Sequence, residues 1–278
     1  MDHSALKDCY RFLGFEAIPF SITPDTSLFF PSSQYVTVFN QISHACMNGV
    51  LAVLTGEIGL GKTMVIRCVL RKMPPQVKVA YLLNPLLDHH ELLRQIYTEF
   101  TGITPPTDMP YSALHGELIE HVLQGSANGQ RYAVIVDEAH RLSPDSLEML
   151  RLLSNLETEH FKLIGLTLVG QPELNRTLML GSMRPLRERI GLWLKLRPMN
   201  HAECSAYIRH RIKLTHREGQ FDFTPLAQWW IHRRSRGVPR RINLAAERAI
   251  LLAFAGSAQR VNWSMARQAC SEFKKVWK

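Results

Sequence analysis

The sequence predicts an α/β fold in which a parallel five-stranded sheet lies between helices, followed by a smaller helical lid domain. Short apolar runs alternate with segments of helical periodicity as far as Pro198, which is typical of strand–helix–strand units. Beyond Pro198 only helical periodicity continues. We expect an N-terminal arm and a capping helix packed on the core over residues 1–48, the α/β core over 49–197 and the lid over 198–278.

A glycine-rich loop joins the first apolar run, residues 50–54, to a helical segment. It fits the pattern G-x-x-x-x-G-K-[ST], whose backbone N–H groups surround phosphates. Lys62 would reach the β- and γ-phosphates of ATP, and the Thr63 hydroxyl would bind Mg²⁺. The alternative is an ordinary glycine-rich turn, which the strand and helix flanks disfavour. The residues expected to contact nucleotide are Gly56, Glu57, Ile58, Gly59, Leu60, Gly61, Lys62, Thr63 and Met64.

Two adjacent carboxylates follow a later apolar strand, residues 132–136. Ligands of open α/β sheets bind at the carboxyl ends of the strands, which is where Asp137 and Glu138 would lie. Asp137 can hold Mg²⁺ through its water shell, and Glu138 can orient and deprotonate a water for attack on the γ-phosphate. An apolar run ending in Asp-Glu is weak evidence alone, but its position downstream of a phosphate loop strengthens the interpretation.

Polar and basic residues mark the ends of the next strands. Gln171 follows the apolar strand 161–169, where it could touch the γ-phosphate or the attacking water, or simply cap the helix from Pro172. Arg184, Arg187 and Arg189 are expected on a short helix, followed by a fifth strand near 192–196. The remaining expected elements are a strand at 77–83 and helices at about 34–48, 88–100, 112–124, 144–157, 201–217, 225–235, 239–255 and 263–277.

Composition limits the possible classes of protein. The five cysteines are scattered singly, which argues against a disulfide framework or a zinc site and favours a reducing cytoplasm. We expect no membrane-spanning segment, because no apolar run approaches the ~18 residues required. Any attachment to a membrane would be peripheral and through a partner.

His89, His90 and His140 could suggest a metal site, but histidines at helix starts and on surfaces are far more common than histidines that bind a metal.

The charge is distributed unevenly along the chain. The net charge of +9 combines −6 over residues 1–175 with +15 over residues 176–278. A basic last third suits nucleic acid or an acidic partner, although arginines that face nucleotide phosphate and solvated helix faces account for it as well.

These features resemble the AAA+ ATPases, and more narrowly their ExeA-like branch. The resemblance covers nearly the whole chain. Within the branch, residues 63–67 and 84–87 are most similar to the members associated with the mannose-sensitive haemagglutinin (MSHA) pilus. The stretches that carry the family resemblance are Tyr10 to Pro24, Leu54 to Glu57, Val136 to Leu142, Leu168 to Leu174 and Gly237 to Asn243.

The resemblance implies roles for individual residues. Lys62 and Thr63 match the Walker A residues, Asp137 and Glu138 the Walker B pair, and Gln171 the first sensor. Arg240 matches the second sensor, a lid arginine that contacts the γ-phosphate. Arg189 best fits the arginine finger offered to a neighbouring subunit, with Arg184 and Arg187 as alternatives. The family forms rings, commonly hexamers, so a homo-oligomer is implied.

Two classes of function follow from this resemblance. The first is a cytoplasmic, Mg²⁺-dependent ATPase that supports assembly of a type IV pilus-like surface fibre, or of a related secretion system, with machinery proteins at the inner membrane as partners. The alternative is a DNA-binding AAA+ regulator of the transposition type, which the basic last third would suit. Binding to nucleic acid is the less favoured of the two.

Overall fold

The computed structural model describes residues 3–83, 88–159, 161–217, 221–273 and 277. The segment 84–87, which contributes to the likeness to MSHA-associated proteins, lies outside this part of the chain. Contacts divide the chain into two compact units, each with its own core. The α/β unit comprises residues 33–58 and 65–196, and the C-terminal unit comprises residues 1–32, 59–64 and 197–278.

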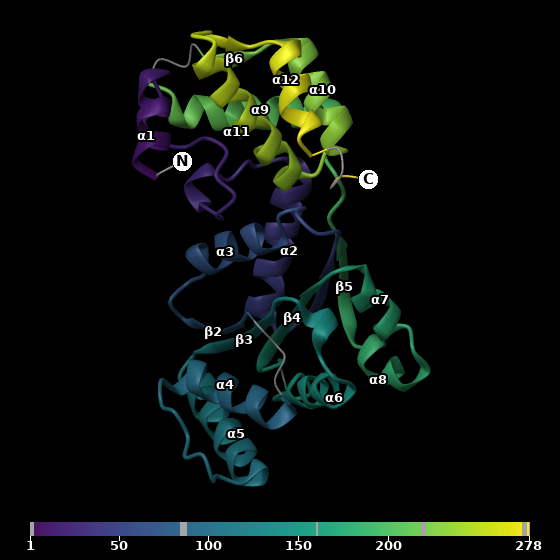
Figure 1. Ribbon diagram of the computed structural model, residues 1–278. Coiled ribbons are helices and arrows are strands. Elements are labelled where there is room, and N and C mark those ends of the chain that lie inside the picture. Colours follow the sequence, from purple (N-terminus) through teal and green to yellow (C-terminus); the bar gives the residue numbers. More distant parts are fainter. Residues whose placement is uncertain (1–2, 84–87, 160, 218–220, 274–276, 278) are drawn as a thin grey trace. The chain divides into compact units, whose positions relative to one another are not determined.

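The α/β unit, drawn in the middle and lower part of Figure 1, is built on a parallel five-stranded sheet with the strand order β2-β3-β4-β1-β5. The predicted fold class is therefore confirmed. Parallel strands place all their carboxyl ends at one edge, and the order brings β3 and β1 to either side of β4. The strands are β1 (Leu51–Thr55), β2 (Val77–Leu82), β3 (Arg131–Val136), β4 (Ile164–Gly170) and β5 (Ile190–Lys195).

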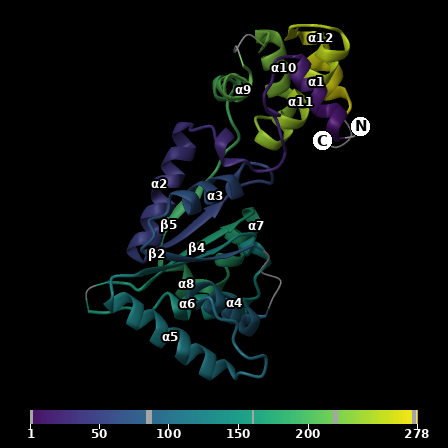
Figure 2. The same ribbon diagram turned by 90° about the vertical axis from the view of Figure 1, so that its left-hand side faces the viewer.

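Helices cover both faces of the sheet, with α2 and α3 on one face and α4, α5 and α6 on the other (Figure 2). Strands β1, β3 and β4 are apolar along almost their whole length because both faces are buried. The helices are α2 (Ser33–Asn48), α3 (Lys62–Lys72), α4 (His89–Thr101), α5 (Tyr111–Ala127), α6 (Pro144–Leu153), α7 (Pro172–Leu178) and α8 (Arg184–Arg187), with short 3₁₀ turns η2 (Ala139–Arg141) and η3 (Gly181–Met183).

The start of α4 follows from its capping residue. Asp88 accepts a hydrogen bond from the backbone N–H of Glu91 over 2.8 Å, as its spacing predicts. Gly165 explains how closely α2 approaches the sheet. A Cβ at this position would meet the carbonyl oxygen of Ala45 at 2.5 Å, so only glycine leaves room for the helix.

Helix α6 is shorter than predicted, and β4 starts later. Two backbone hydrogen bonds form here instead, since Leu163 N donates to Leu156 O and Thr158 N donates to Phe161 O, each over 2.9 Å. This local pairing satisfies backbone groups that a longer helix or strand would otherwise bond. The expectations of a helix to 157 and a strand from 161 were therefore wrong at these ends.

The C-terminal unit is helical, as predicted, but it also holds two very short strands that pair in parallel. Asn200 and Glu203 form a capping box at the start of its first long helix, as their spacing predicts. Its elements are α1 (His3–Phe12), the 3₁₀ turn η1 (Thr26–Leu28), α9 (His201–Thr215), β6 (Asp222–Phe223), α10 (Pro225–Ser235), α11 (Pro239–Ala255), β7 (Arg260–Val261) and α12 (Trp263–Ser271).

The N-terminal arm differs most from expectation. Residues 1–32 group with the C-terminal unit rather than with the α/β core, and they include a helix, α1. Glu16 N donates to Thr215 O over 2.8 Å, and the Phe15 ring meets the His216 ring edge-on at 4.9 Å between centroids. The aromatic residues of the arm thus complete the core of the lid. The helix α2 groups with the α/β core.

Among the described residues, no helix is both long enough and apolar enough to cross a bilayer.

Candidate functional site

The glycine-rich loop connects β1, which ends at Thr55, to α3, which begins at Lys62. Gly59 and Gly61 have φ angles of 83° and 87°, a left-handed conformation that glycine adopts without strain. The first N–H groups of α3 have no partner within the helix, and such helix starts bind phosphates. Lys62 is buried, with 6% of its surface exposed. The loop therefore has the local geometry expected of a phosphate-binding loop.

The middle of this loop packs against the start of α11. Arg240 N donates to Gly59 O over 3.2 Å. A Cβ at Gly59 would lie only 2.8 Å from the Cβ of Arg240 and 3.2 Å from Val238, so the close approach requires glycine. This contact places the backbone of the predicted second-sensor arginine directly beside the loop.

Asp137 follows β3 at the carboxyl edge of the sheet and is 2% exposed. Its Oδ1 accepts a hydrogen bond from Glu138 N over 2.9 Å, and its Oδ2 accepts one from the Tyr81 hydroxyl over 3.3 Å. Burial, with the negative charge of Asp137 as the next cause, raises the pKa of Tyr81 well above its ordinary value. Tyr81 therefore keeps its proton and holds the carboxylate of Asp137 in place.

Glu138 has a left-handed backbone with φ of 54°, which is uncommon for a residue other than glycine. Such a conformation costs of the order of 1 kcal/mol and is found most often at functional sites. Its carboxylate Oε2 lies 3.5 Å from Nδ1 of His140. The turn thus directs the side chain of Glu138 towards the residues that follow β3 and β4.

Gln171 follows β4 and occupies the N-cap position of α7, yet its side chain makes no capping hydrogen bond. Its Nε2 instead lies 3.3 Å from Oε2 of Glu138 and 3.2 Å from Nε2 of His140. The structure therefore brings the side chains of Glu138, His140 and Gln171 together at this edge. The sequence predicts Glu138 and Gln171 here.

Sequence reasoning missed three residues around this edge. Tyr81 was counted only as part of a strand, and His140 was considered only as a metal ligand. Asn175, on α7, donates from Nδ2 to the Thr55 hydroxyl over 3.3 Å, where β1 ends. The signal that could have found Tyr81 is its place near the end of β2, since strand ends converge at this edge.

The three candidate arginines differ in their surroundings. Arg184 pairs with Glu188 over 2.7 Å, and Arg187 donates to Met179 O over 3.2 Å. Arg189 is exposed and lies between α8 and β5, not on the short helix as predicted. Among the described residues, its side chain has no hydrogen-bond or ion-pair partner. Arg189 thus differs from the other two in having an exposed side chain with no partner among the described residues.

The donor chemistry fits Mg²⁺. Asp137 offers a buried carboxylate, and Thr63 offers a hydroxyl directly after the loop, both being oxygen ligands of the kind that Mg²⁺ prefers. Within the described ranges, no cluster of three or more His, Cys, Asp or Glu side chains could bind a metal. His89 and His90 both pack edge-on against the Tyr111 ring.

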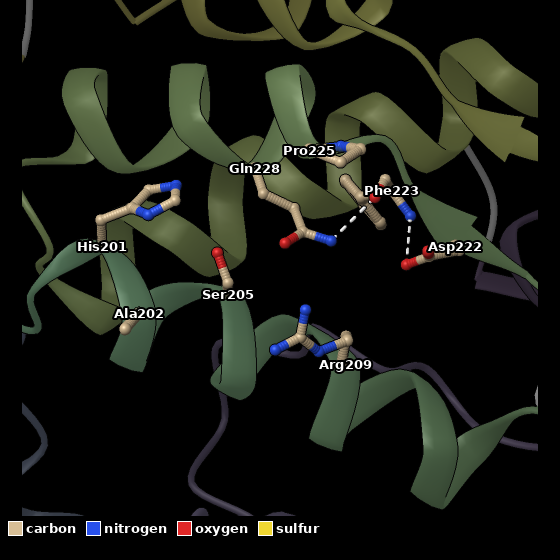
Figure 3. Close-up of a pocket in the computed structure, with 8 residues that line it drawn as sticks. All are labelled: His201, Ala202, Ser205, Arg209, Asp222, Phe223, Pro225 and Gln228. Carbon is tan, nitrogen blue, oxygen red and sulfur yellow. Dashed lines mark hydrogen bonds between the residues drawn. The ribbon is translucent and has the colours of Figure 1, made fainter.

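A separate hollow in the C-terminal unit lies between α9 and the start of α10 (Figure 3). Gln228, on its wall, donates to Phe223 O over 2.7 Å, and Phe223 N donates to Asp222 Oδ1 over 2.7 Å. These bonds hold the turn between β6 and α10, so we give the polar groups of this hollow a structural role.

Most residues of the candidate site lie in a region that is similar to a known protein family. Residues 47–178 match the model of the AAA domain. This stretch of the chain is similar to AAA domains. The match begins before β1 and ends with α7, so the matched region contains the loop, the two carboxylates and Gln171.

A relative covers more of the chain than the AAA domain alone. General secretion pathway protein A of Aeromonas hydrophila is 38% identical over 252 residues, which is 90% of this chain and 46% of that protein. The chain therefore spans less than half the length of this relative.

Solved structures share the fold at low sequence identity. Cdc6p from Pyrobaculum aerophilum superposes with a TM-score of 0.69 and 17% identity, covering 89% of this chain and 71% of its own. The ORC2 protein of Aeropyrum pernix, solved in ADPNP–ADP complexes, gives a TM-score of 0.64 at 19% identity, and the match covers 86% of this chain and 66% of that one. The RuvB branch migration motor of Thermotoga maritima gives a TM-score of 0.60 at 19% identity, and the match covers 91% of this chain and 74% of that one. The chain has the fold of the AAA+ P-loop NTPases.

Proposed function

We propose that this chain is a Mg²⁺-dependent ATPase that works as a ring and supports assembly of a type IV pilus-like surface fibre of the MSHA type, or of a related secretion system. The AAA domain and the identity to general secretion pathway protein A support ATP hydrolysis in a secretion-type assembly. The likeness of residues 63–67 and 84–87 to MshM, the ATPase associated with the MSHA pilus, favours the pilus over other secretion systems.

One observation carries the catalytic part of the proposal. Asp137, Glu138 and Gln171 follow β3 and β4 at the edge of the sheet where β1 leads into the glycine-rich loop. Polar residues at the ends of adjacent strands, beside the strand that feeds a phosphate loop, are what hydrolysis of a nucleotide requires.

The proposed roles follow from the chemistry of each group. The backbone of Gly56 to Met64 would hold the phosphates, and the Lys62 ammonium would bind the β- and γ-phosphates. Thr63 and Asp137 would hold Mg²⁺, which supplies charge neutralisation on the phosphates when bound. Glu138 would accept a proton from the attacking water, because its carboxylate lies at the carboxyl end of β3 beside the amide of Gln171.

The sensors and the finger complete this assignment. Gln171 would detect the γ-phosphate or the attacking water while it also holds Glu138. Arg240, whose backbone lies beside Gly59, would bind the γ-phosphate from the lid. Arg189 is exposed without a partner among the described side chains, which suits a finger that enters the site of a neighbouring subunit. A ring, commonly a hexamer in this family, would supply that neighbour.

A direct test combines an assay of the purified chain with a gene deletion in the bacterium of origin. We expect phosphate release from ATP that requires Mg²⁺ and stops with excess EDTA. In the bacterium of origin, deletion of the gene should remove surface fibres while pilin subunits still accumulate in the cell. Turnover without any effect on fibres or secretion would keep the ATPase assignment and reject the assembly role.

The DNA-binding alternative makes a different prediction. Because its basic residues would contact the phosphate backbone, the protein would form ATP-dependent rings or filaments on duplex DNA that persist near physiological salt. Binding that fades by moderate salt and ignores the nucleotide is expected from the proposed function. A gel-shift comparison with ATP, with ADP and without nucleotide distinguishes the two.

A further inference from the structure

Three tryptophan rings form a continuous row across two packed helices of the C-terminal unit. Helices α10 and α12 contact each other. The Trp230 ring lies 6.0 Å from Trp229 on its own helix and 6.0 Å from Trp263 on α12, measured between centroids. We call the exposed residues around this row the tryptophan–arginine surface, which consists of Leu226, Trp229 and Arg233 on α10 and Trp263 and Arg267 on α12.

The sequence spacing of these residues places them on one face of each helix. Leu226, Trp229 and Arg233 recur at three and four residues, as do Trp263 and Arg267 at four, so each set lies on one face of its helix. Leu226 is 65% exposed, and the Trp229 and Trp263 side chains are 43% and 39% exposed. Exposed tryptophans gathered with a leucine are unusual on a surface that meets only water.

An arginine from the same helix lies over each exposed indole. The Arg233 guanidinium carbon is 5.6 Å from the centroid of the Trp229 ring, and that of Arg267 is 5.3 Å from the Trp263 ring. A guanidinium that stacks on a ring uses its face, so its in-plane N–H groups stay available to an anion. The surface therefore combines apolar area with two positioned cations.

The charge of this region is unbalanced. Residues 225–271 contain eight arginines and a single acidic residue, Glu247. Some exposed arginines of the C-terminal unit pair with carboxylates, as Arg197 does with Glu203 and Arg248 with Glu272. Neither Arg233 nor Arg267 has an ion-pair partner among the side chains that the structure describes. Carboxylates from outside the molecule are the complement that this surface lacks.

We propose that the tryptophan–arginine surface binds an acidic amphipathic helix of a partner protein. Its carboxylates would pair bidentately with Arg233 and Arg267, and its apolar side chains would cover Leu226, Trp229 and Trp263. Tryptophan and arginine are the residues that most often dominate binding energy at interfaces. The inference specifies the chemistry of the partner in the proposed assembly function, and it does not depend on ATP hydrolysis.

Two other anionic occupants fit the surface less well. Nucleobases bind by stacking on open ring faces, whereas Arg233 and Arg267 already cover Trp229 and Trp263. Anchoring in a bilayer requires apolar side chains that reach into the acyl region, but more than half of each indole is covered by the protein. The side chains of a partner helix can pack across the exposed parts of Trp229 and Trp263 without inserting between them and their arginines.

The test is selection of peptides on the immobilised full-length chain from a displayed library of randomised helical peptides. We expect enrichment of sequences that place Asp or Glu and Leu, Ile or Phe on one face at spacings of three and four residues. A labelled synthetic copy of the best sequence is then titrated by fluorescence anisotropy. The double substitution Arg233→Glu and Arg267→Glu should weaken this binding by about tenfold or more, because it replaces two attractions with repulsions.

A matched control is Arg209→Glu, an exposed arginine on α9 outside the surface, which should change the affinity by less than about twofold. ATP hydrolysis should be similar in all these variants, so a failure of the ATPase assignment is distinguishable from a failure of this proposal. Enrichment of peptides without acidic residues, or equal binding to the double variant, would overturn it. So would stronger, substitution-sensitive binding of a single-stranded oligonucleotide, of phosphatidylglycerol vesicles or of a second copy of the chain.

Discussion

Gln171 donates a hydrogen bond from its Nε2 to Oε2 of Glu138 over 3.3 Å, joining the end of β4 to the end of β3. A residue expected to detect the γ-phosphate is thus bonded to the residue expected to activate water. A phosphate or water bound by the Gln171 amide would lie beside the Glu138 carboxylate that the same amide positions. The contact therefore offers a physical connection between sensing the nucleotide and hydrolysing it.

This connection predicts non-additive kinetics. Gln171→Ala should lower kcat for ATP hydrolysis by about tenfold with little change in KM, because the base loses its positioning partner while phosphate binding persists. In the Glu138→Gln background the same substitution should have almost no further effect, because no base remains to be positioned. Phosphate-release assays on the two single variants and the double variant measure this. Additive losses would show that Gln171 acts independently of Glu138.

The arginine finger predicts activity that depends on assembly. Hydrolysis per subunit should rise with protein concentration, and Arg189→Ala should remove most of that rise, since a finger can contribute ~10³–10⁵ in rate. Arg184→Ala and Arg187→Ala are matched controls, because both side chains already have partners.

Mixing two inactive variants tests the same assignment more sharply. An interface with intact Glu138 from one subunit and intact Arg189 from the other is complete, so Arg189→Ala mixed with Glu138→Gln should regain part of the activity. If Arg187→Ala shows this complementation and Arg189→Ala does not, Arg187 is the finger.

The packing of the loop against α11 predicts a stability difference between two glycines. Gly59→Ala should destabilise the protein by about 1–3 kcal/mol, because φ is 83° and the new Cβ would lie 2.8 Å from Arg240. Gly116→Ala in α5 meets nothing within 4 Å and should be stabilising by about 0.5–1 kcal/mol. Thermal unfolding of both variants, with and without ATP, provides the measurement. Equal effects would mean that the loop does not pack against α11 in solution.

The capping box of α9 predicts a contribution to acid stability. Hydrogen bonds from Arg197, together with that from Asn200 N, lower the pKa of Glu203 below its ordinary value. A lowered pKa in the folded state stabilises the protein above the unfolded pKa, about 4.3, and this stability is lost as the pH falls.

Glu203→Gln should therefore cost about 1 kcal/mol at pH 7 and flatten the loss of stability between pH 5 and pH 3. Glu272→Gln is the control, because the Arg248–Glu272 pair is exposed and should contribute less than about 0.5 kcal/mol. Urea unfolding at several pH values gives the comparison. An unchanged pH dependence in Glu203→Gln would remove the capping box as its origin.

Local patterns predicted the parts of the site that depend on local physics. The glycines of the loop, the carboxylates after β3 and the cap at Asp88 each follow from neighbouring residues, and the sheet followed from the apolar runs. The association of the arm with the lid could not be predicted, because it depends on contacts such as that of Phe15 with His216, about two hundred positions away in sequence.

The same limit applies to the interactions of Glu138. Its left-handed backbone and its contact with Gln171 arise where β3 and β4 end beside each other. Periodicity gives the strands but not their order, so the sequence indicated a role for Gln171 without indicating its partner. His140 was missed for the same reason, since its second contact comes from the neighbouring strand end.

The most direct test of the central claim separates nucleotide binding from turnover in two variants of the full-length chain. With Mg²⁺, binding of a fluorescent ATP analogue and phosphate release are measured for Lys62→Ala and Glu138→Gln. The account predicts that Lys62→Ala loses measurable affinity for the nucleotide. Glu138→Gln should bind the nucleotide about as tightly as the unmodified protein does, but its rate of phosphate release should be lower by a factor of about 10² or more. Unchanged hydrolysis in Glu138→Gln, or unchanged affinity in Lys62→Ala, would contradict it.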